Sequence, residues 1–77
     1  MEIGDTIQLL DTVVLLESIP DAGLLRGNVG TVVEVFEPPH ADHVEVEFAD
    51  HQGQTTAMLA VPRIKLLKLR EEFRQAS

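Results

Sequence analysis

The sequence contains no cysteine, tryptophan or tyrosine, and each absence removes a class of structure or activity. Without cysteine there can be no disulfide, thiolate zinc site or cysteine nucleophile. This composition suits the reducing cytoplasm, where we expect the protein to act. Three phenylalanines are the only aromatic side chains of the Phe, Tyr and Trp group, so few flat faces can stack on bases, sugars or proline-rich peptides.

Basic residues are also scarce, with six Lys and Arg against thirteen Asp and Glu, giving a net charge of −7. A charge of this sign argues against nucleic acid as a partner, because phosphate binding uses clustered cations. Five of the six cations nevertheless fall near the C-terminus: Arg63, Lys65, Lys68, Arg70 and Arg74. This segment either folds back on the acidic remainder of the chain, which we favour, or forms a basic stripe for RNA.

No apolar run approaches the ~20 residues that a membrane-spanning helix needs. The start of the chain, with Glu2 and Asp5, has neither the basic residues nor the apolar stretch of a signal peptide. We therefore expect a protein that is soluble, without a membrane partner.

Short runs of β-branched and apolar residues alternate with turn residues along the chain. Val44, Val46 and Phe48 alternate with Glu45 and Glu47, which is typical of a strand with one buried face. Applied throughout, the pattern predicts four strands, at residues 12–18, 29–37, 43–48 and 55–61. A short fifth strand is expected within 64–69, where the apolar spacing fits a strand or a helix. The chain is then one all-β domain over residues 1–77, with its core at about 7–69 and a helical or extended tail at 70–77. In a helical tail, Lys68 and Glu72 would pair.

Three of these strands carry apolar residues on both faces. Val13 and Leu15 alternate with Val14 and Leu16, and similar surpluses occur at 29–37 and 55–61. Only one of the two faces can point into a barrel. The other is covered from within the chain, which we favour, or by a partner or second copy.

The order of motifs along the chain resembles a known bacterial family. The residues that carry the resemblance are Leu10 to Leu16, Ile19-Pro20, Gly23-Leu24, Arg26 to Glu34, Val44 to Phe48 and Leu59 to Pro62. Together they resemble the family called domain of unknown function 4926 over about residues 7–69. The resemblance implies a five-stranded SH3-like barrel and no catalytic residue. Leu24, Gly27, Gly30 and Val32 are also similar in spacing to the turn and strand of KOW modules, although the loops here are acidic.

The residues able to support catalysis or metal binding form no recognisable set. His40, Asp42, His43 and His51 have metal-ligand chemistry, but their spacing matches no standard site, and solvated loop histidines are the simpler interpretation. Serines and threonines lack a nearby His and acid to activate them. We therefore expect no enzymatic activity, no cofactor and no metal.

What remains is a non-catalytic protein-interaction module, with an unidentified protein partner or self-association. It would be the small member of a protein pair, such as an antitoxin-like neutraliser or an accessory subunit. The expected partner-binding residues are Leu24, Leu25, Phe36, Glu45, Glu47 and Met58. The alternative is a KOW-like module that contacts nucleic acid or the ribosome through the basic C-terminal segment.

Overall fold

The structure is a computed structural model that describes residues 6–70, and it is all-β apart from two short 3₁₀ turns. The strands are β1 (Thr12–Leu15), β2 (Val29–Val35), β3 (His43–Ala49), β4 (Thr55–Pro62) and β5 (Leu66–Lys68). The 3₁₀ turns are η1 (Pro20–Ala22) and η2 (Arg63–Lys65). All five predicted strands are therefore present.

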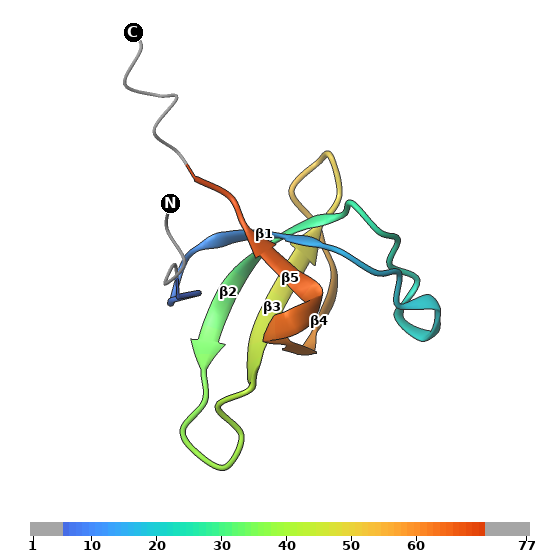
Figure 1. The fold of residues 1–77 in the computed structure, drawn as a ribbon. Helices are drawn as coiled ribbons and strands as arrows, with labels where there is room; N and C mark the ends of the chain where they lie inside the picture. The colour runs from blue at the N-terminus through green and yellow to red at the C-terminus, as the bar shows by residue number, and fades with distance from the viewer. Residues whose placement is uncertain (1–5, 71–77) are drawn as a thin grey trace, which may run out of the picture.

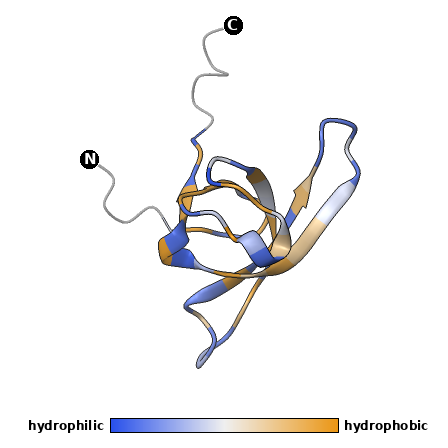
Figure 2. Ribbon diagram, turned by 90° about the vertical axis from the view of Figure 1, so that its right-hand side faces the viewer, coloured by the Kyte–Doolittle hydropathy of each residue, from blue (hydrophilic) through white to orange (hydrophobic). Residues whose placement is uncertain are grey.

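The strands form one antiparallel sheet in the order β4-β3-β2-β1-β5, which curls round on itself (Figure 1). Seen from the side, the ribbon makes a partial ring whose strands are mostly apolar and whose hairpin loops are hydrophilic (Figure 2). No ladder joins β4 to β5 in the described part of the chain, so the barrel is loose and its sheet is not closed.

Buried and outward-facing side chains alternate along the strands, so that one face of the sheet fills the interior. Phe48 is the largest of the fully buried side chains, and it packs in a mostly aliphatic cluster. The core consists of Ile7, Val13, Leu15, Leu24, Val32, Val44, Val46, Phe48, Val61 and Leu66. On β3 the predicted faces are confirmed, with the valines and Phe48 inside and the glutamates outside.

Gly30 shows why a glycine stands inside β2. A Cβ at this position would lie 2.7 Å from Val46 Cγ1 and 2.9 Å from the backbone oxygen of Glu47. The two strands therefore approach too closely for any side chain.

The first strand is shorter than predicted. The strand expected at 12–18 ends at Leu15, and the short last strand expected within 64–69 is Leu66–Lys68. The chain bends after Leu15, while η2 occupies the start of the range 64–69. The expected tail pairing of Lys68 with Glu72 lies outside the described residues.

Candidate functional site: two outer faces of the sheet

The first candidate surface lies on the outside of β2, β1 and β5. Val14 is directly opposite Val29 on one side and Leu67 on the other, so three aliphatic side chains form a row across three strands. Val29 is 50% exposed and Leu67 is 52% exposed. Leu16 and Leu69 lie two residues further along their chains and are also exposed. We call Val14, Leu16, Val29, Leu67 and Leu69 the apolar face.

The apolar face is not covered by the described part of the chain. Cover from within was favoured from the sequence, with the first ten residues as one candidate. Instead, Ile7 enters the core, while Leu9 and Leu10 are themselves exposed. Residues 71–77 lie outside the described region. Within residues 6–70, therefore, Val14 stays half-buried, and Leu16, just beyond β1, stays exposed.

The second candidate surface lies on the outside of β2, β3 and β4. Glu34 is directly opposite Glu45, and Glu47 follows two residues along β3. On the other side of β3, Ala60 is opposite Glu45 and Met58 is opposite Glu47. We call these five residues the acidic face.

The carboxylates of the acidic face have few partners. The Thr55 hydroxyl donates a hydrogen bond to the Glu47 carboxylate. Within residues 6–70, no Lys or Arg forms an ion pair with any of the three glutamates. Like charges placed directly opposite on neighbouring strands destabilise a sheet, so this arrangement favours a cation from outside.

Four of the six predicted partner-binding residues meet at this second surface. Glu45, Glu47 and Met58 belong to the acidic face, and Phe36 lines a hollow of about 320 Å³ with His40, His43 and Ala60. Ala60 joins the hollow to the acidic face.

The other two predicted residues are separated from this surface and from each other. Leu24 is 3% exposed, because its bridge with Ile19 folds the β1–β2 loop back over the core. It is a core residue, and its prediction as a binding residue needs correction. Leu25 is 66% exposed on the same loop, and its N–H donates to the Asn28 side-chain oxygen.

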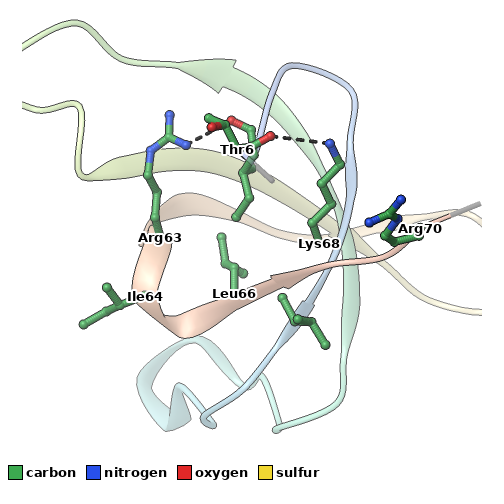
Figure 3. A pocket seen from close by; sticks show the side chains of 8 residues that line it. Thr6, Arg63, Ile64, Leu66, Lys68 and Arg70 are labelled. Atoms are coloured by element: carbon green, nitrogen blue, oxygen red, sulfur yellow. Dashed lines mark hydrogen bonds between the residues drawn. The ribbon is translucent and has the colours of Figure 1, made fainter. Parts of the chain in front are cut away.

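The basic residues mostly hold the chain together. Arg63 donates to the carbonyl of Ala41 at 2.7 Å and to that of Ile7 at 2.9 Å. Lys68 lies 3.3 Å from the Asp11 carboxylate and 3.4 Å from the carbonyl of Thr6. Figure 3 shows both side chains reaching across a hollow of about 630 Å³ toward the first described residues. Arg74 lies outside the described region.

The histidines and Asp42 do not form a cluster. His43 begins β3, whereas His51 lies on the turn beyond its far end. Within residues 6–70, no three His, Cys, Asp or Glu residues are grouped so that they could hold a metal ion. A side-chain hydrogen bond joins His43 Nδ1 to Asp42 Oδ1 at 3.0 Å, and it is the main cause that lowers the pKa of Asp42.

Sequence reasoning pointed to Val14 and Leu16 as surplus apolar residues but missed Val29 and Leu67 as their neighbours. The available signal was the apolar residue on the outer face of each strand. The sequence did not show the strand register, which places Val14 between Val29 and Leu67. The apolar face is therefore a property of strand pairing and not of any one strand.

Comparison with known proteins identifies a family. A family model described as domain of unknown function (DUF4926) matches residues 9–68, which is most of the chain. The chain belongs to this family. No curated protein and no solved structure was found to match the DUF4926 chain. In the described residues of this DUF4926 domain, no helix is long and apolar enough to cross a membrane.

Proposed function

We propose that this domain is a non-catalytic module that binds one protein partner through the apolar face. The observation that carries the proposal is the row Val29–Val14–Leu67, three aliphatic side chains in register on the outside of the sheet. Contiguous exposed apolar surface of this kind commonly marks a protein-binding site. The partner would be a folded protein with a complementary apolar patch.

The charge distribution supports a protein partner over nucleic acid. Lys65 lies 3.7 Å from Glu17, and Lys68 pairs with Asp11, so both cations have partners inside the domain. Arg63 is used to bind backbone carbonyls. The KOW-like alternative requires these groups to leave such partners before they contact phosphate. We propose further that the module acts in the cytoplasm, as an antitoxin-like or accessory member of a protein pair.

The proposal is tested by capture from extract of the source cells, with the wild-type domain and two charge variants as bait. Leu67→Glu places a carboxylate in the apolar face. Met58→Glu is the matched control, because Met58 has nearly the same exposure, 53%, but lies on the acidic face. Both side chains point outward, so both variants should fold, which circular dichroism checks.

We expect a stoichiometric protein partner that survives nuclease treatment. Leu67→Glu should reduce its recovery at least tenfold, in keeping with loss of a central apolar contact. Met58→Glu should retain it. Loss of the captured partner after nuclease treatment would favour the KOW-like alternative. Equal recovery of the partner with both variants would exclude the apolar face as its binding site.

A further inference from the structure

The outer edge of β4 is not paired with another strand in the described residues. β4 is an end strand of the sheet, eight residues long, and its ladder runs to β3 alone. On its other side, no backbone hydrogen bond joins Thr55–Pro62 to another described residue. A row of unpaired N–H and C=O groups is satisfied by water or by a strand from another chain.

β4 has few of the features that usually protect such an edge. Charged residues make up 25% of the chain, yet none occurs in the β4 sequence TTAMLAVP. Pro62, which cannot donate a hydrogen bond, stands only at its last position, and the bulge against β3 lies at its first residues. By comparison, the opposite edge strand β5 is three residues long and carries Lys68. Long, uncharged edges favour association.

We propose that two copies of this chain pair through their β4 edges, antiparallel and about a two-fold axis. Such an axis requires each residue to face one on the same side of the sheet. Placing Met58 opposite Met58 of the second copy meets this condition. It aligns Thr56–Ala60, while Thr55, which the bulge turns outward toward Glu47, stays outside the new ladder together with Val61 and Pro62. The two sheets then form one continuous sheet across the dimer.

The negative charge of the chain does not prevent this pairing. Glu47 lies on β3, one strand in from the edge, so it and its counterpart are separated by three strand spacings, about 14 Å. The Debye length at physiological ionic strength is about 8 Å, and the repulsion is largely screened. It follows that the dimer should weaken when salt is removed.

This dimer is separate from the proposed partner site. The axis lies between the two β4 strands, whereas the apolar face lies across β2, β1 and β5 at the other end of the sheet order. A second copy is favoured over a foreign strand because the edge is uncharged and can align with itself. A foreign strand at β4 is an outcome that the test separates.

The experiment is sedimentation equilibrium of the whole chain from low micromolar to about 500 µM, where mass action reveals a weak dimer. Here Met58→Glu is the test variant. Met58→Glu places two carboxylates opposite each other on the axis, beside Glu47 of each copy. Leu67→Glu, with nearly equal exposure, is the control. Amide hydrogen exchange at both ends of the concentration range locates the contact.

We expect a wild-type dimer whose dissociation constant rises at least tenfold in Met58→Glu and less than twofold in Leu67→Glu. Amides of β4 should become protected as concentration rises. A wild-type chain that stays monomeric throughout would overturn the inference, as would a dimer broken by Leu67→Glu alone. A monomer that gains β4 protection only with the captured partner would assign the edge to that partner instead.

Discussion

At Gly30 the strands β2 and β3 lie so close together that there is no room for a Cβ atom. In Gly30→Ala the new methyl group would meet Val46 Cγ1 and the fixed backbone oxygen of Glu47, both within 3 Å. The strands must move apart, and overpacking of this kind costs about 2–3 kcal/mol. Urea unfolding followed by circular dichroism measures the loss.

Gly53→Ala is the control, because it separates crowding from backbone strain. Gly53 has φ 82°, and a Cβ there has no heavy atom within 4 Å. Its cost should be only the left-handed backbone penalty, about 1 kcal/mol. Equal losses in the two variants would show that β2 and β3 are not in such close contact.

The hydrogen bond between Asp42 and His43 leads to a prediction for the pKa of Asp42. The hydrogen bond from His43 is the largest cause that holds the pKa of Asp42 below its usual 3.8. Because the folded pKa is depressed, the stabilising contribution is present above the usual value and is lost as the pH falls through the folded pKa. His43→Phe, which has no donor, should return the pKa of Asp42 toward its usual range.

Carboxyl carbon shifts in an NMR titration measure this change directly. His40→Phe is the comparison, since the charge of His40 is the smallest contribution to the shift. The His40 variant should move the pKa of Asp42 less than the His43 variant does. The reverse order would contradict the hydrogen bond as the main cause.

At the scale of elements, Arg63 joins three segments that are far apart in sequence. Arg63 lies in η2, between β4 and β5, and its side chain donates hydrogen bonds to the carbonyls of Ile7 and Ala41. Arg63→Met keeps the aliphatic stem and removes both bonds. Charge-assisted bonds are worth about 1.5–3 kcal/mol each, and partial exposure lowers this to an expected total of about 1–2 kcal/mol.

Denaturant unfolding of Arg63→Met measures the loss, with Arg26→Met as control. Arg26 is exposed, and it is its backbone N–H that donates a hydrogen bond to the Ser18 hydroxyl. The control should change stability by less than about 0.5 kcal/mol, as surface substitutions usually do. A similar loss in both variants would mean that the Arg63 clamp contributes nothing beyond its charge.

The elements also show how far the sequence predicts the fold. Strict alternation predicted β3 correctly, because burial of one face leaves a period of two in the sequence. The predicted end of β1 was wrong, and the bounds of β5 stayed open, because tertiary contacts decide both. After β1 the N–H of Leu16 bonds to the carbonyl of Lys65, and η2 precedes the last strand, leaving Ile64 exposed.

The candidate surfaces were only partly predictable for the same reason. Glu45, Glu47 and Met58 share a face because β3 and β4 form a hairpin, whose register a short turn constrains. The neighbours of Val14 come from residues that are distant in sequence. Leu24, in a polar loop, looked exposed, but its bridge to Ile19 buries it.

For the whole molecule, the balance of charge has a measurable effect on stability. The net charge is −7, and Glu34 opposes Glu45 without a cation in the described region. Self-repulsion of this kind destabilises the compact state and is screened by salt. The free energy of unfolding should therefore rise by about 1 kcal/mol between roughly 0.01 M and 0.3 M sodium chloride.

Two variants separate the opposed pair from the overall charge. Glu34→Lys turns a repulsive cross-strand pair into an attractive one, worth about 0.5–1 kcal/mol at low salt. Glu37→Lys makes the same change of net charge in the loop after β2, away from Glu45. Thermal unfolding at low micromolar concentration keeps the chain monomeric. If Glu34→Lys is the more stable of the two and its salt dependence is shallower, the acidic face stores repulsion that a basic partner would relieve. If the two variants are equal, only total charge matters, and the acidic face has no special attraction for cations.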